Sequence, residues 1–321
     1  MATTVLGLKT FTASDPVDYN EINDNYNKID SGVKTAMQGR AAHNLLDNSD
    51  FRNPVNQRGK NTYSDAGNEY TIDRWTTQYS TNISIENGYI TIFGQWELYQ
   101  RIQNPKDGIY TFAARIRVNS VGQYTPNIIL YDGSSAANER LLDANTGEWE
   151  TYIFQHDLSS TTGETITFAL VPRGGNTTAS ISVEWAAMYK GSYDASTLPA
   201  YQPKGYAAEL AECQRYYYQS NDNKYGQDGM IIRRAISVEG STNSYSLESV
   251  ELPTTMRVTP TITIYDGSGN ANVAQEWYSN NQVFNISIRY ANNRSFCVAS
   301  EAGGFVGGKS YYFQYTASAD L

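Results

Sequence analysis

The sequence has 321 residues, of which 40% are apolar and 18% charged, and it carries a formal net charge of −9. Its length predicts roughly two to three domains, and its acidic balance argues against nucleic acid as a partner, because phosphate binding relies on Lys and Arg. No apolar run approaches the roughly 20 residues that span a bilayer, and residues 1–10 lack the features of a signal peptide, so we expect no membrane insertion.

The uncharged remainder of the composition favours β structure. Asn, Ser, Thr, Gly and 26 Tyr are abundant, a mixture typical of short strands and turns. Cys213 and Cys297 are too few for a disulfide framework, and their spacing fits no metal motif. We expect both thiols to be buried, and a pairing between them stays open. His43 and His156 supply all the imidazole, so candidates for metal binding or nucleophilic chemistry are few.

The first predicted element is a helix over residues 14–37, with Ser14 or Asp15 as its N-cap and Pro16 in its first turn. Apolar side chains then recur at alternating spacings of three and four residues, which places them on one stripe. The stripe consists of Tyr19, Ile22, Tyr26, Ile29, Val33 and Ala36. Such a stripe needs an apolar partner, either on the same chain or on another copy, and we favour self-association.

A β domain over residues 41–200 is predicted next. Leu45, Leu46 and Phe51 are expected to anchor a first strand. Residues 83–92 alternate apolar and polar side chains around Asn87-Gly88, which predicts a hairpin with a two-residue type I′ turn. The further alternating segments are residues 110–118, 148–154, 165–171 and 180–188. Strands at this spacing indicate an antiparallel β-sandwich of the jelly-roll kind.

The third predicted region, residues 201–321, contains a short helix and a second, smaller β-sandwich. A Ser- and Pro-containing connection over residues 191–205 is expected to follow the surface. The helix, residues 207–218, is expected to pack on the domain that follows it. The alternating segments of that domain are residues 261–265, 284–288 and 311–315. The fold class is therefore mainly β, with an N-terminal helix and two antiparallel sandwiches.

Several segments resemble bacteriophage tail-fibre and receptor-binding proteins. These segments are residues 44–51, 54–59, 73–75, 183–185, 201–203, 209–217 and 315–321. The opening block also resembles the start of carbohydrate-binding modules appended to bacterial polysaccharidases. The resemblance implies a homotrimeric fibre, assembled in the bacterial cytoplasm and located in the virion tail. It further implies that residues 1–40 attach to other tail or baseplate proteins, although residues 1–15 match no pattern, and that the distal domains contact glycans of the host surface.

Aromatic side chains are the natural candidates for sugar binding, because their flat faces pack on the C–H groups of a sugar ring. Trp96 and Tyr99 follow the predicted hairpin and lie among polar residues. Trp277 and Tyr278 are adjacent in a polar segment of the distal domain. We select these four residues as glycan-binding candidates. The alternative for any single aromatic is a packing role, which we expect for Trp75, Trp149 and Trp185 because they have apolar neighbours.

No metal or cofactor is predicted, and we expect no catalysis. Jelly-roll modules of the resembling kind often hold a structural calcium, for which Asp50 or Glu184 offers oxygen ligands, whereas Asp132 and Asp266 precede Gly and are better explained as turn formers. Glu148 and Glu150 share a strand face, but no catalytic motif accompanies them. The alternatives to a glycan-binding fibre are a virion structural or decoration protein and a polysaccharide depolymerase.

Overall fold

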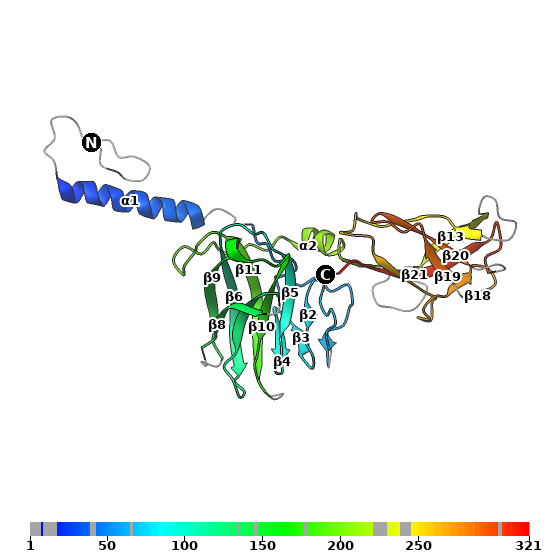
Figure 1. Ribbon diagram of the computed structural model, residues 1–321, viewed down its shortest axis with the longest axis horizontal. Coiled ribbons are helices and arrows are strands. Elements are labelled where there is room, and N and C mark those ends of the chain that lie inside the picture. Colours follow the sequence, from blue (N-terminus) through cyan, green and yellow to red (C-terminus); the bar gives the residue numbers. More distant parts are fainter. Residues whose placement is uncertain are drawn as a thin grey trace.

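The computed structural model describes residues 8, 18–38, 43–64, 67–133, 135–143, 147–175, 179–220, 230–237, 245–284, 286–300 and 304–320. These residues form helix α1, a first β-sandwich, a short helix α2 and a second β-rich domain (Figure 1). The mainly β class with sandwich-like antiparallel sheets is thus confirmed. Among the residues described, no helix is long and apolar enough to cross a membrane.

Helix α1 spans Tyr19–Gln38 and extends away from the sheets in Figure 1. Its first turn is held by Asp18, whose carboxylate accepts a hydrogen bond from the Asn20 amide at 2.8 Å. The predicted start at residue 14 is therefore wrong, because Asp18 lies before the helix and caps it. The predicted cap residues 14–16 and the side chain of Ala36 lie outside the described residues. The apolar stripe is largely exposed to solvent: Tyr19 and Tyr26 are 76% and 67% exposed. Within the part of the chain that the structure describes, no segment buries these two side chains.

The first sandwich consists of two antiparallel sheets. The six-stranded sheet has the order β1 (Thr62–Tyr63), β3 (Asn82–Glu86), β4 (Tyr89–Phe93), β11 (Ser180–Lys190), β6 (Ile109–Ser120) and β9 (Trp149–Asp157). The five-stranded sheet has the order β2 (Thr76–Thr77), β5 (Leu98–Gln103), β10 (Thr165–Val171), β7 (Asn127–Asp132) and β8 (Ser135–Leu141). A 3₁₀ turn, Leu158–Ser160, follows β9. Between the sheets, Phe51 and Phe168 pack edge-on against Trp75, with ring centroids 5.0 and 6.3 Å away.

Two local predictions in this domain need correction. The hairpin is confirmed by the pairing of β3 with β4, but only Gly88 of the turn pair has a positive φ, at 95°, whereas a type I′ turn requires it at both positions. Residues 44–51 form no continuous strand. Among the residues described, they pair with a sheet only through an isolated bridge between Asp50 and Trp185. Asn48 instead organises a loop, because its side chain bonds the backbone of Val55 and Asp73.

The connection over residues 191–205 follows the surface of the first sandwich, as predicted, and it also packs there. It covers the outer face of the six-stranded sheet, where Tyr193, Leu198 and Tyr201 contact a buried cluster that includes Trp185 and Tyr189. The rings of Trp185 and Tyr201 stack with centroids 4.7 Å apart. This segment therefore provides the packing partner that buries Trp185.

Helix α2 spans Tyr206–Cys213, shorter than predicted, because Tyr217 and Tyr218 belong to strand β12 (Tyr217–Gln219). The expectation that this helix packs on the following domain is also wrong. The carboxylate of Glu209 accepts a hydrogen bond from the backbone of Asn48 in the first sandwich, and Cys213 is fully buried. Burial raises the pKa of the Cys213 thiol. Both cysteines are free, and Cys297 is half-buried.

The second domain is built around the long strand β21 (Ser310–Ser318). Its first half pairs with β13 (Ile231–Ser237) and β17 (Ala274–Glu276), and its second half pairs with β12 and β16 (Thr261–Tyr265). The other strands are β14 (Tyr245–Leu247), β15 (Val250–Glu251), β18 (Gln282–Val283), β19 (Ile286–Arg289) and β20 (Ser295–Ser300). Phe296, Tyr311, Phe313 and Tyr315 lie in its core.

Candidate functional site

The outer face of the five-stranded sheet carries an unusual apolar strip. Tyr99 on β5, Ala169 on β10 and Ile129 on β7 lie opposite one another across adjacent strands. Ile129, Ala169 and Val171 are buried although they point away from the sandwich core, and Tyr99 and Tyr131 pack against them. Because a solvent-facing side of a sheet is normally polar, this strip is a candidate ligand-binding floor.

A pocket of about 210 Å³ lies at one end of this strip. It is lined by Gln95, Trp96, Glu97, Tyr124, Ile129, Tyr131, Val171 and Arg173. Ile129 and Val171 form an apolar floor, and Trp96, which is 37% exposed, supplies an aromatic wall. The Trp96 ring also packs on the exposed Tyr79 ring with a centroid distance of 5.0 Å. Apolar floors with aromatic walls and a few polar groups are typical of small-ligand sites.

Three loops that carry the pocket residues are tied together at Gly174. The Gly174 amide donates to the carbonyl of Gly94 at 3.0 Å, and the Gln123 amide donates to the Gly174 carbonyl at 2.8 Å. A Cβ atom on Gly122 would lie 2.3 Å from the Gly174 oxygen, so only glycine allows this approach. The walls that carry Trp96, Tyr124 and Arg173 are therefore fixed by backbone contacts.

The polar groups of the pocket are partly buried. The Tyr131 hydroxyl donates to the carboxylate of Glu97 at 3.2 Å. Burial raises the pKa of Glu97, although this hydrogen bond opposes the shift, and burial with the neighbouring Glu97 raises the pKa of Tyr131 to about 12. The Glu97 side chain is 8% exposed and lines the pocket, so its carboxylate can accept a hydrogen bond from a ligand hydroxyl.

Of the predicted binding residues, Trp96 lines the pocket and Tyr99 lies on the same sheet face. Tyr79, Tyr124, Tyr131 and Arg173, which come from separate strands and loops, were not predicted from the sequence. The sequence Arg173-Gly174-Gly175 could have indicated part of this site, since two consecutive glycines mark a turn or loop. Arg173 itself adopts a left-handed backbone conformation with φ of 54°.

Trp277 and Tyr278 lie together at the tip of the β17–β18 turn, away from this pocket in the second domain. The Trp277 ring packs edge-on against Tyr312 with a centroid distance of 5.8 Å, and the Tyr312 hydroxyl donates to Asn280 at 2.9 Å. Trp277 is 46% exposed and Tyr278 is 89% exposed. The turn thus presents two aromatic faces on a fixed support, and both remain predictions as binding residues.

The remaining tryptophans differ in their surroundings. Trp75 is fully buried and Trp185 is 8% exposed, which agrees with a packing role. Trp149 is only half-buried. Its ring lies against Tyr89, and the guanidinium of Arg117 lies 4.8 Å from its centroid, on the six-stranded sheet.

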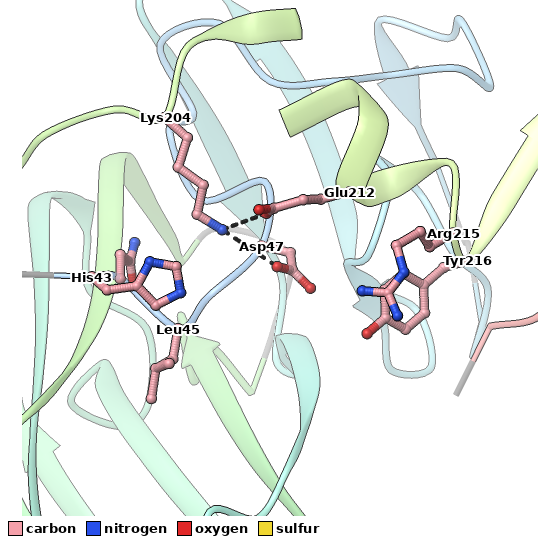
Figure 2. A pocket seen from close by; sticks show the side chains of 8 residues that line it. His43, Leu45, Asp47, Lys204, Glu212, Arg215 and Tyr216 are labelled. Carbon is pink, nitrogen blue, oxygen red and sulfur yellow. Dashed lines mark hydrogen bonds and ion pairs between the residues drawn. The ribbon is translucent and has the colours of Figure 1, made fainter. Parts of the chain in front are cut away.

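A second pocket lies beside α2, where the two domains meet (Figure 2). Asp47, Glu209 and Glu212 bring their carboxylates within 4.8 Å of one another, but the Lys204 ammonium lies among them, 2.6 Å from Glu212 and 3.5 Å from Asp47. Arg74 also pairs with Asp47 at 3.0 Å. The cluster is a network of ion pairs and does not fit a cation that needs six or more converging oxygens.

The calcium ligands considered from the sequence are also paired with cations. Asp50 bonds the guanidinium of Arg52 at 2.6 Å, and Glu184 bonds that of Arg115 at 3.0 Å. Asp266 acts in a turn, as predicted. The Asp266 carboxylate accepts hydrogen bonds from the amides of Ser268 and Asn270. Asp132 ends β7 just before Gly133, whose φ is 61°, and its carboxylate accepts a hydrogen bond from the Gly163 amide at 3.2 Å.

The similarities of this chain to known proteins are weak. No protein-family model matches the sequence, and no curated protein matches it. Solved structures similar to this chain include one titled "CBM4 structure and function", at 16% identity over 45% of this chain and 98% of that chain, with a TM-score of 0.32. Another is the second N-terminal cellulose-binding domain of Cellulomonas fimi β-1,4-glucanase C, at 11% identity over 48% and 99%, with a TM-score of 0.33.

A third similar structure is the CBM22-1 xylan-binding domain of Paenibacillus barcinonensis Xyn10C, at 11% identity over 47% of this chain and 96% of that chain, with a TM-score of 0.30. At this level of similarity, neither the ligand nor the function of these modules transfers to this chain.

Proposed function

We propose that this protein is a non-catalytic adhesin that binds glycans of a bacterial surface through the Trp96 pocket. The observation that carries the proposal is the combination of an apolar floor, the Trp96 wall and the buried acceptor Glu97 on loops fixed at Gly174. A sugar ring offers an apolar C–H face and a rim of hydroxyls, and this arrangement matches both. Fixed loops also reduce the entropy lost when the ligand binds.

In its finer form, the proposal is that the chain is the receptor-binding part of a bacteriophage tail fibre. The support is the sequence resemblance together with the exposed stripe of α1, which a second and third copy would cover. A trimer would present three copies of each site. Tethered sites raise avidity by roughly 10² to 10⁴ without improving the individual contacts, so a shallow pocket is sufficient. Residues 1–40 would attach this fibre to the virion.

The runner-up is a virion structural or decoration protein that binds no sugar. The experiment that separates the two is a glycan array and a whole-cell pull-down with the full chain displayed at high valency. We expect the wild type to bind and Trp96→Ala to bind at least about tenfold more weakly, with the melting temperature unchanged. Tyr278→Ala and Trp277→Ala, tested in parallel, show whether the distal turn contributes. A blank array and pull-down would favour the structural role.

Catalysis is tested separately, since a depolymerase would also bind polysaccharide. We expect no release of reducing ends when the protein is incubated with host polysaccharide. A sustained release would replace adhesion by depolymerisation as the function.

A further inference from the structure

We propose that the Trp96 pocket selects a sugar residue that carries an acidic group, and that Arg173 sets this specificity. The inference rests on the proposed function and names the ligand class of the same pocket. It follows from the hydrogen-bonding state of Arg173, from its backbone conformation and from the size of the pocket.

The guanidinium of Arg173 has donors to spare. Its partner among the described residues is Glu139, at 3.8 Å, which is too long for a hydrogen bond. The same carboxylate oxygen of Glu139 accepts a hydrogen bond from the Asn127 amide at 2.7 Å, so Glu139 is engaged elsewhere. A guanidinium carries five N–H donors in a planar fork that matches a carboxylate, phosphate or sulfate. Arg173 thus brings an anion-binding group to the wall of the pocket.

The backbone conformation of Arg173 supports a binding role for its side chain. A φ of 54° is unfavourable for a residue with a Cβ atom and natural for glycine. Packing does not account for the choice of arginine, because 40% of the side chain is exposed. Strained residues of this kind concentrate at binding sites. The Tyr124 amide holds the strained residue in place by donating to its carbonyl at 3.3 Å.

The size and charge of the pocket define the rest of the ligand. At about 210 Å³, the pocket is smaller than the roughly 300–1,000 Å³ that drug-sized ligands occupy, so it accepts one sugar residue. Stacking on Trp96 places the ring over the apolar floor, with its acidic substituent at Arg173 and its hydroxyls at Glu97.

The test uses an array that carries neutral, uronic-acid, sulfated and phosphorylated glycans, together with uronic-acid polysaccharides before and after chemical reduction of their carboxyl groups. We expect the full-length protein to bind acidic glycans at least about tenfold more tightly than their neutral or reduced counterparts, in line with a charge-assisted hydrogen bond. Arg173→Gln should lose this preference. Arg140→Gln should keep it, because Arg140 is an exposed arginine of the same sheet that does not line the pocket.

The outcomes separate this inference from the function on which it rests. No binding to any glycan would contradict glycan binding itself. Equal binding to native and carboxyl-reduced polysaccharide, with no preference for sulfated or phosphorylated glycans, would overturn the acidic ligand while leaving adhesion intact. If Arg173→Gln weakened the binding of acidic and neutral glycans by the same factor, Arg173 would have only a structural role, and the inference would be wrong. The class of acidic glycan that binds identifies whether the anion is a carboxylate, sulfate or phosphate.

Discussion

The guanidinium of Arg58, in the first sandwich, lies 3.8 Å from the ring centroid of Tyr217, in strand β12 of the second domain. Arg58 also forms ion pairs with Asp73 at 3.6 Å and with Asp320 at 3.0 Å, so it links the start of one domain to the end of the other. The side chains of Asp73 and Asp320 are 1% and 9% exposed. Burial raises the pKa of Asp73 and of Asp320, and the charge of Arg58 opposes both shifts.

A second arginine repeats the arrangement. The Arg74 guanidinium lies 3.6 Å from the ring centroid of Tyr216, and the Ala319 amide donates to the Tyr216 carbonyl. Arg58, Arg74, Tyr216 and Tyr217 all belong to the segments that resemble phage tail fibres. Four of those segments, residues 54–59, 73–75, 209–217 and 315–321, therefore meet at the joint between the domains.

Replacing Arg58 should uncouple the two domains. Arg58→Ala leaves Asp73 and Asp320 without their shared cation, and removing one partner of a buried ion pair costs roughly 3 kcal/mol. We expect the wild type to unfold in one thermal transition, and Arg58→Ala to unfold in two or at a melting temperature several degrees lower. Arg52→Ala is the control, because Arg52 pairs with Asp50 inside one domain. An unchanged melting curve for Arg58→Ala would show that the joint does not depend on this residue.

Gly122→Ala should damage the Trp96 pocket from a distance. The added Cβ atom would lie 2.3 Å from the Gly174 oxygen, so the loops that carry Tyr124 and Arg173 must separate. We expect a loss of roughly 1–3 kcal/mol of stability together with loss of glycan binding. Gly67→Ala in the same domain meets its nearest atom at 3.5 Å and should be neutral. If calorimetry gave the same melting temperature for both variants, the close approach of Gly122 to the Gly174 carbonyl would be contradicted.

The connection over the six-stranded sheet should weaken in acid. Hydrogen bonds from Ser196 and Thr197 lower the pKa of Asp194 to about 2. A carboxylate with a depressed folded-state pKa contributes stability above its unfolded pKa of about 3.9, and this contribution is lost as the pH falls through the folded value. The difference in melting temperature between wild type and Asp194→Asn should therefore shrink from pH 5 to pH 2. A difference that is constant over this range would exclude this role for the Asp194 charge.

The stripe of α1 should determine the oligomeric state. Ile22→Asn together with Ile29→Asn places polar side chains on the stripe, and we expect light scattering to report a trimer for wild type and a monomer for this variant. Asn27→Ala is the control, since Asn27 lies off the stripe and is exposed. A wild-type monomer at micromolar concentration would refute trimerisation.

The sequence predicted what depends on local periodicity. Helix α1, the hairpin of β3 and β4, and the sandwich class follow from side-chain spacing and turn residues. It failed for α2, because the helical spacing of Leu210, Cys213 and Tyr217 does not reveal that Tyr217 pairs in a strand with Ser318. It also mistook the loop around Asn48 for a strand, since hydrogen bonds to Val55 and Asp73 are not visible in a periodic pattern.

The site was predictable only in part for the same reason. Trp96 is conspicuous because a large aromatic residue follows a hairpin among polar neighbours. Tyr131 and Arg173 reach the pocket through the pairing of β7 with β10 and through the loop contacts at Gly174, both of which join residues distant in the sequence. Tertiary contacts, rather than composition, assemble the pocket.

The most direct test of the central claim is an equilibrium titration of the tightest-binding glycan from the array into wild type, Trp96→Ala and Trp149→Ala. Trp149 is a suitable control, because it is a half-buried tryptophan on the opposite sheet of the same domain. We predict that Trp96→Ala weakens binding at least tenfold, about 1.4 kcal/mol, at an unchanged melting temperature, while Trp149→Ala binds as wild type. Wild-type affinity in Trp96→Ala would contradict the claim that this pocket holds the sugar.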